Sequence, residues 1–219
     1  MNFKTLIPAL LVAATASGFG MMSSTNTAQA TSTATTAAVA EIGKAAPAFT
    51  LMDTDGKKVS LADFKGKTVV LEWFCPTCPY SGGRGARSIH ASGKVGALMT
   101  SMKKADPDAV YLLIDSSTKK MRTTAEELAK QDAAIKKKLG IASPILIDGD
   151  TSVAKAYGAK TTPHVFVIDG EGVLRYQGAF DDQKKDGTNY VLTSVTAIKK
   201  GEKVEPTYVR QYGCGVRTN

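Results

Sequence analysis

Apolar and polar positions along the chain change repeatedly between a period of two and a period of 3.6. Residues 48–53 (AFTLMD) alternate, and an Asp-Gly pair at 55–56 separates them from a second short run. This arrangement predicts a β-hairpin, followed by a short helical turn over 60–64. The next run, 68–74 (TVVLEWF), is β-branched and aromatic and predicts a buried strand.

Helical and extended segments then alternate as far as residue 201. The clearest helix covers 123–140, where threonines precede Glu126 and Glu127 in a capping pattern and the last turn is rich in lysine. The other expected segments are a helix from just after Cys75 to about 104, strands at 109–115, 145–148, 164–169 and 173–179, and helices at 151–158 and 189–201. Strands that alternate with helices pair in parallel, whereas the Asp-Gly-Glu-Gly turn at 169–172 predicts an antiparallel hairpin. We therefore expect a three-layer α/β domain, with a mixed central sheet flanked by helices and an N-terminal β-hairpin extension.

The N-terminal 40 residues differ from this pattern. Lys4 precedes an apolar segment at 6–20, and 28–30 (AQA) offers a small-x-small cleavage site. Together these are typical of a secretory signal peptide over 1–30. Residues 31–40 are small and uncharged, which predicts a disordered linker before a single domain over 41–219. We expect an exported protein, periplasmic or extracellular, with no stable membrane insertion, because no later segment reaches the ~18 apolar residues of a membrane helix.

The charge balance excludes one class of partner. The chain carries 28 basic and 20 acidic residues, a formal net charge of +8. Its lysine pairs are scattered over predicted helix ends and loops, without interleaved aromatic residues or a nucleic-acid motif. We therefore expect no nucleic-acid partner, and the sequence predicts no oligomeric state.

The candidate chemistry lies in 71–83 (LEWFCPTCPYSGG). Cys75 and Cys78 follow the buried strand, and the remaining cysteine, Cys214, lies five residues from the end. In an exported protein disulfides persist, and an odd cysteine count leaves at least one thiol free, exchanging or bound. A thiol between a strand end and a helix start is stabilised as thiolate, and the C-x-x-C spacing brings a second sulfur within disulfide range. We expect Cys75 to be the more exposed, attacking thiolate and Cys78, one turn into the helix, to resolve the mixed disulfide.

A metal site is the alternative reading of these cysteines. A structural zinc needs four ligands, and the chain has no second paired motif. The residues that remain as ligands are Cys75, Cys78, Cys214, His90 and His164. Pro79 stands where a c-type haem site requires histidine, so haem attachment is excluded.

Three segments make a family recognisable: 43–80, 157–182 and 212–216 (YGCGV). Over about 41–219 the chain resembles the thioredoxin-like redoxins, in particular the exported, TlpA-like relatives of the alkyl hydroperoxide reductase and thiol-specific antioxidant group. The resemblance implies a thioredoxin fold in which Pro163 follows a cis peptide bond and lies against the cysteines. It also implies that the backbone of Thr162 pairs with an incoming chain, and that Phe74, which stands where thioredoxins carry tryptophan, contacts the substrate.

The sequence also departs from its relatives. Peroxiredoxins carry a threonine three residues before their peroxide-reacting cysteine, but here the residue three before Cys75 is Glu72. They also carry an arginine in the active site, and neither Arg84 nor Arg87 matches its position in their motif. Many close relatives lack the first cysteine and keep those matching Cys78 and Cys214. This resemblance implies a second pair, Cys78–Cys214, as an alternative to Cys75–Cys78.

The sequence therefore predicts an exported thiol–disulfide oxidoreductase that works by dithiol–disulfide exchange through the CPTC motif, without a bound cofactor. Its expected partners are protein or small-molecule thiols and disulfides, and an electron-donor redox protein. One alternative is a peroxiredoxin-like thiol peroxidase, in which Cys75 or Cys78 becomes a sulfenic acid and Cys214 or the neighbouring cysteine resolves it. The other is a copper- or zinc-binding carrier that uses Cys75, Cys78 and His164.

Overall fold

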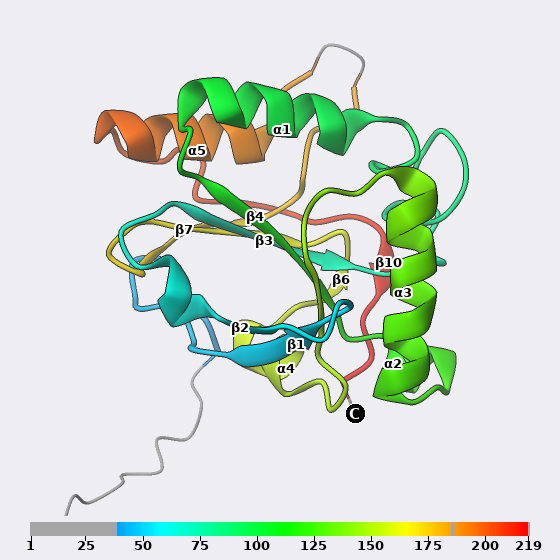
Figure 1. The fold of residues 1–219 in the computed structure, drawn as a ribbon. Helices are drawn as coiled ribbons and strands as arrows, with labels where there is room; N and C mark the ends of the chain where they lie inside the picture. The colour runs from blue at the N-terminus through cyan, green and yellow to red at the C-terminus, as the bar shows by residue number, and fades with distance from the viewer. Residues whose placement is uncertain (1–38, 185–186, 219) are drawn as a thin grey trace, which may run out of the picture. The chain divides into compact units, whose positions relative to one another are not determined.

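A mixed sheet of eight strands forms the centre of the protein (Figure 1). The structure is a computed structural model that describes residues 39–184 and 187–218. The strands, in the order in which they pair, are β2 (Lys58–Ser60), β1 (Thr50–Asp53), β5 (Ile145–Ile147), β4 (Val110–Asp115), β3 (Val69–Phe74), β7 (Val165–Ile168), β8 (Leu174–Gly178) and β9 (Tyr208–Val209). Strands β3, β4 and β5 pair in parallel, whereas β1–β2 and β7–β8 are antiparallel hairpins. The predicted mixed sheet and its N-terminal hairpin are confirmed.

Five α-helices and one 3-10 helix are described around the sheet. They are η1 (Leu61–Phe64), α1 (Lys94–Ala105), α2 (Thr118–Met121), α3 (Ala125–Leu139), α4 (Ser152–Tyr157) and α5 (Tyr190–Lys200). The predicted capping of α3 is confirmed: the Thr124 side chain accepts from the Glu127 N–H, and the Glu127 carboxylate accepts from the Thr124 N–H. The short helix α2 and the strands β9 and β10 (Cys214–Gly215) were not expected from the sequence.

The sheet has an apolar core on each face. Helices α1 and α5 lie side by side over one face (Figure 1), where Leu98 and Val195 pack with the sheet residue Val70. Helix α4 covers the other face, where Tyr157 packs with Trp73. Because β3 contributes to both cores, all six of its residues are buried. The end of β3 is thereby fixed at the centre of the sheet, and the cysteines follow it directly.

The predicted signal peptide and most of the predicted linker lie outside the described residues. Ala40, the last residue of that linker, is already buried and donates its N–H to the Ala156 carbonyl. The ordered domain therefore begins at least one residue before Glu41. Within 39–184 and 187–218, no helix is both long enough and apolar enough to cross a membrane.

Candidate active site

The segment after the cysteines is a series of turns, not the helix that the sequence predicted. Helix α1 begins only at Lys94, well beyond Cys78. Two glycines explain the difference, because the chain folds back closely over the cysteine motif. A Cβ atom at Gly82 would lie 2.5 Å from the Phe74 ring, and one at Gly83 would lie 2.6 Å from the Cys78 carbonyl oxygen. Without a helix at this point, the expected helix-dipole stabilisation of a Cys75 thiolate does not apply.

Both motif cysteines are buried. Cys75 has no exposed surface and Cys78 is 1% exposed, so the prediction that Cys75 is the more exposed thiol is wrong. The turns that follow are hydrogen-bonded to the motif: the Gly82 and Gly83 N–H groups donate to the carbonyls of Cys75 and Cys78 at 3.1 and 2.7 Å. The Cys75 Sγ lies 3.4 Å from the Thr77 hydroxyl. Cys214, in contrast, is partly exposed.

The loop that contains Pro163 lies against Cys78. The Thr162–Pro163 peptide bond is cis, as the resemblance implied. Thr162 belongs to β6 (Thr161–Thr162), and its carbonyl oxygen lies 3.0 Å from the Cys78 Sγ, which donates to it. The structure therefore brings Cys75, Cys78 and the Thr162–Pro163 bond together at the carboxyl end of β3.

The C-terminal tail completes this cluster. Strand β10 pairs antiparallel with β6, and Cys214 stands directly opposite Thr162 in the register. The red C-terminal segment in Figure 1 accordingly runs beside β6. The Cys214 side chain lies close enough to Cys78 for each thiol to shift the pKa of the other. All three cysteines of the chain thus converge at one site, although residues 75 and 214 are far apart in sequence.

The hydrogen bonds around Cys78 favour its thiolate. Burial raises the pKa of Cys78, but hydrogen bonding by the side chains of Thr162 and Cys214 and by the backbone of Tyr80 and Cys214 outweighs it, so the pKa is lowered overall. Burial and the hydrogen bond with Cys78 raise the pKa of Cys214 to about 11. Cys78 is therefore the more acidic thiol of this pair, and Cys214 keeps its proton at neutral pH.

The sequence matches a known family over most of the domain. The sequence profile of the Redoxin family matches residues 41–192, which is more than half of the chain. The chain belongs to the Redoxin family. Thiol-disulfide oxidoreductase ResA of Bacillus thuringiensis subsp. konkukian is 28% identical over 162 residues, which cover 71% of this chain and 79% of ResA. Peroxiredoxin Q, chloroplastic, of Populus jackii is 28% identical over 160 residues, which cover 70% of this chain and 68% of that protein.

A solved structure has a similar fold. The crystal structure of a hypothetical protein from Sinorhizobium meliloti 1021 matches with a TM-score of 0.67 and 29% identity, covering 83% of this chain and 97% of that chain. The predicted thioredoxin-like fold is confirmed, and the redoxin is an oxidoreductase that acts on thiols and disulfides, with peroxiredoxins among its relatives.

Beneath its cysteine motif the redoxin contains a buried polar network that the sequence did not predict. Glu72 is fully buried, and its carboxylate contacts the His90 Nε2 at 3.1 Å and accepts from the Tyr111 hydroxyl at 2.7 Å and the Ser81 hydroxyl at 3.1 Å. These bonds tie the turn segment to β3 and β4. Burial and the nearby Glu72 charge raise the pKa of Tyr111 well above its usual value. The sequence did contain one sign of this network: Glu72 is an acidic residue in the middle of the apolar run 68–74, and a buried carboxylate needs polar partners.

A buried pair of acidic side chains lies close to Cys75. Asp115, at the end of β4, is the register partner of Phe74, and Asp132 projects from α3. Three of their four carboxylate oxygens have no hydrogen-bond partner in the described structure. Burial raises the pKa of Asp115 to about 7, and burial together with the Asp115 charge raises the pKa of Asp132 to about 10. The pair therefore retains a proton near neutral pH.

The remaining predicted site residues lie away from solvent or from the thiols. Phe74 is fully buried, and its ring packs edge-on against His90, so its contact with a substrate stays a prediction. Burial lowers the pKa of His164 to about 3, and its ring packs on Phe166 in the core. Arg87 lies over the Tyr80 ring, 5.6 Å from its centre. Among the residues that the structure describes, no three His, Cys, Asp or Glu side chains are grouped to hold a metal ion, so the carrier reading gains no support.

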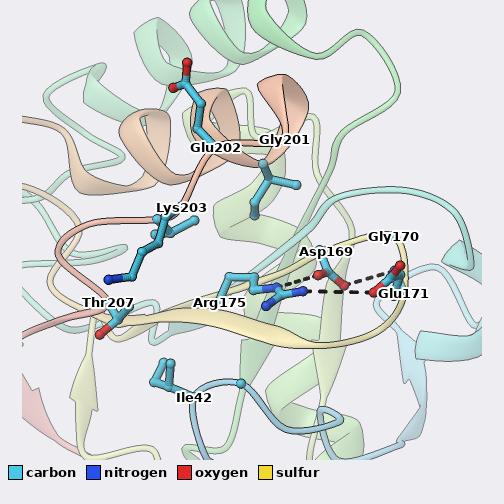
Figure 2. Close-up of a pocket in the computed structure, with 12 residues that line it drawn as sticks. Ile42, Asp169, Gly170, Glu171, Arg175, Gly201, Glu202, Lys203 and Thr207 are labelled. Carbon is cyan, nitrogen blue, oxygen red and sulfur yellow. Dashed lines mark hydrogen bonds and ion pairs between the residues drawn. The ribbon is translucent and has the colours of Figure 1, made fainter.

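A pocket of about 600 Å³ lies at the opposite end of the sheet (Figure 2). It is lined by the 169–172 turn, by Arg175 of β8 and by the chain after α5. Arg175 is paired with Asp169 at 2.5 Å, so its charge is already compensated. The turn follows Ile168, which pairs with Val69 at the start of β3, whereas the cysteines follow the end of β3. This pocket is therefore separate from the thiol cluster.

Proposed function

We propose that this redoxin is an exported thiol–disulfide oxidoreductase that works through its CPTC motif, with Cys78 as the attacking thiolate. The observation that supports this most directly is that the Cys78 sulfur contacts Thr162 of the cis-proline loop and the Cys214 thiol, and that its pKa is lowered. The attacking role therefore moves from Cys75, where the sequence placed it, to Cys78. Cys75 and Cys214 are then two alternative resolving thiols.

The proposed exchange has two steps. The Cys78 thiolate attacks one sulfur of a disulfide RSSR, forming a Cys78–SR mixed disulfide and releasing one thiolate. The second thiol, of Cys75 or Cys214, then attacks the Cys78 sulfur, forms an intramolecular disulfide and releases the second thiolate. The protons of the two protein thiols end on the two released RS groups. An external thiol reductant restores the reduced protein, and the same steps in reverse oxidise a dithiol.

Single and double cysteine variants test this assignment in an assay that couples reduction of a small disulfide to glutathione. We expect Cys78→Ser to abolish turnover. Cys75→Ser and Cys214→Ser should each retain part of it, because the other resolving thiol remains. Mixed with the small disulfide alone, without glutathione, the double variant C75S/C214S should stop at a mixed disulfide that mass spectrometry detects. Full activity of the Cys78→Ser variant would refute the proposal.

A thiol peroxidase is the second candidate, and the Cys78–Cys214 contact favours it. A hydroperoxide would oxidise the Cys78 thiolate to a sulfenic acid and leave as an alcohol or water. Cys214 would then attack the Cys78 sulfur, forming a disulfide and releasing water. Stopped-flow consumption of hydrogen peroxide by the wild type and the Cys214→Ser variant, with dimedone trapping of the sulfenic acid, tests this. If the wild type neither consumes peroxide nor forms a dimedone adduct, the thiol peroxidase candidate is refuted.

Export is also part of the proposal. It is supported by Lys4, the apolar segment 6–20 and the AQA site at 28–30. In an exported compartment a cysteine pair can cycle through a disulfide. To return to its reduced form there, the enzyme needs an electron-donor redox protein as partner. N-terminal sequencing of protein recovered from a periplasmic or culture fraction should begin at Thr31. Recovery of only the uncleaved chain in the cytoplasm would contradict this.

A further inference from the structure

The C-terminal tail occupies the backbone edge at which an extended substrate chain would pair. An unpaired strand edge binds an extended peptide through main-chain hydrogen bonds, and the edge next to the cysteines here belongs to β6. In this protein β10 already takes that edge, with Cys214 opposite Thr162 and Gly215 opposite Thr161. The tail therefore stands where a substrate chain would stand, with a cysteine opposite the residue that contacts Cys78.

Contacts on both sides of β10 hold the tail in place. Before it, the Tyr212 hydroxyl donates to Asp181 at 2.6 Å. After it, the Val216 N–H donates to the Lys160 carbonyl at 3.0 Å, and its side chain packs against the core on the α4 face. The Lys119 ammonium donates to the Thr218 carbonyl at 3.1 Å. The strand is thus anchored at several points and not only by its two paired residues.

Gly213 allows the tail to approach this closely. Its φ is +119°, a conformation that residues with a side chain rarely adopt, and a Cβ atom there would overlap the Thr162 carbonyl oxygen. Gly215, two residues further, has open space around it and no such φ. The two glycines of the YGCGV segment therefore differ: one is required for docking of the tail and the other is not.

From these observations we infer that residues 213–216 exclude extended protein chains from the site and restrict the enzyme to small oxidants such as low-molecular-weight disulfides. This inference rests on the proposed function and names its substrate class. A compact molecule needs access only to the Cys78 sulfur, whereas a chain needs the whole β6 edge. Because the tail belongs to the same molecule, it competes at an effective concentration of about the millimolar range, far above that of most protein substrates.

The chemistry is consistent with this restriction. The Cys78 thiolate attacks a small disulfide RSSR and releases RS⁻. Cys214, which stands opposite Thr162 next to Cys78, then attacks the Cys78 sulfur, forms the Cys78–Cys214 disulfide and releases the second RS group with its own proton. The product disulfide fixes the tail on the β6 edge covalently, so the oxidised enzyme remains closed to protein chains until an external thiol reduces it.

Gly213→Val and Gly215→Ala form a matched pair for the test. The full-length protein is assayed with hydroxyethyl disulfide as the small substrate and with insulin as the protein substrate. We expect Gly213→Val to raise the insulin rate relative to the hydroxyethyl disulfide rate by ~10-fold or more, because it releases a competitor of high effective concentration. Gly215→Ala should leave the ratio unchanged. Faster alkylation of Cys214 in Gly213→Val would show that the tail has been released.

The outcomes separate this inference from the proposed function. If wild type lacks Cys78-dependent turnover of hydroxyethyl disulfide, the proposed function fails. If that turnover is present but the ratio is the same in wild type and in a Gly213→Val variant whose tail is released, only the inference fails. Val216→Asp, which breaks the anchor beyond β10, serves as a second release variant should Gly213→Val not fold. An unchanged ratio in Val216→Asp with rapidly alkylated Cys214 would overturn the inference equally.

Discussion

The buried acidic pair near Cys75 should make the protein less stable as the pH rises. The folded-state pKa values of Asp115 and Asp132 are raised to about 7 and about 10, mainly by burial. Both values lie above those of the unfolded chain, so their contribution to stability is fully present below about pH 4 and is lost as the pH rises through the folded pKa values. Each proton that the folded chain retains over the three pH units from pH 4 to pH 7 corresponds to a loss of ~4 kcal/mol over that range.

Asp132→Asn should remove much of this loss. The amide has nearly the same shape, carries no charge, and offers a donor to the Asp115 oxygen that now has no partner. We expect the variant to be more stable than wild type at pH 8 by ~1–3 kcal/mol, the usual cost of an unsatisfied buried polar group. Its stability should also depend less on pH between 5 and 8.

Urea unfolding in the presence of reductant measures both quantities, followed by the fluorescence of the single, buried Trp73. Asp148→Asn is the matched control. Asp148 is equally buried but accepts hydrogen bonds from the Ser116 hydroxyl and the N–H groups of Val153 and Ala154. The same substitution there should destabilise the fold by ~1–3 kcal/mol. The reasoning is refuted if Asp132→Asn is less stable than wild type at pH 8 and keeps the wild-type dependence on pH.

Three further predictions concern the thiol site. Cys214→Ala removes the side-chain hydrogen bonding that lowers the pKa of Cys78, so the pH profile of Cys78 alkylation should shift to higher pH, and an unshifted profile would contradict this. Glu72→Gln weakens the buried hydrogen bonds with Tyr111, Ser81 and His90 and should cost ~1–3 kcal/mol in urea unfolding; an unchanged stability would show that the network is not important for stability. Gly83→Ala places a Cβ 2.6 Å from the Cys78 carbonyl and should displace the motif, lowering disulfide turnover together with the melting temperature; unchanged values of both would show that the turn relaxes freely.

Local patterns determined much of the fold in advance. The capping pair Thr124 and Glu127 and the Gly140 stop define α3 within two residues of its predicted ends, because helix caps are made by residues close in sequence. The Asp-Gly-Glu-Gly turn likewise predicts the β7–β8 hairpin. The cysteine motif was correctly placed at the end of a buried strand, since β3 is apolar on both faces.

Only the tertiary structure decided how the site is built. The residues after Cys78 form turns because Gly82 and Gly83 approach Phe74 and the motif backbone, which periodicity does not report. The partner of Thr162 lies 52 residues away, in a strand of two residues that is too short to leave a pattern.

The thiol properties depend on the same long-range contacts. Burial and hydrogen bonds set each thiol's exposure and acidity, and these come from whichever segments pack around the sulfur. The sequence by itself therefore determined that three cysteines were available and that two of them follow a buried strand. Packing of the tail against β6 decided that Cys78, and not Cys75, lies between the cis-proline loop and Cys214.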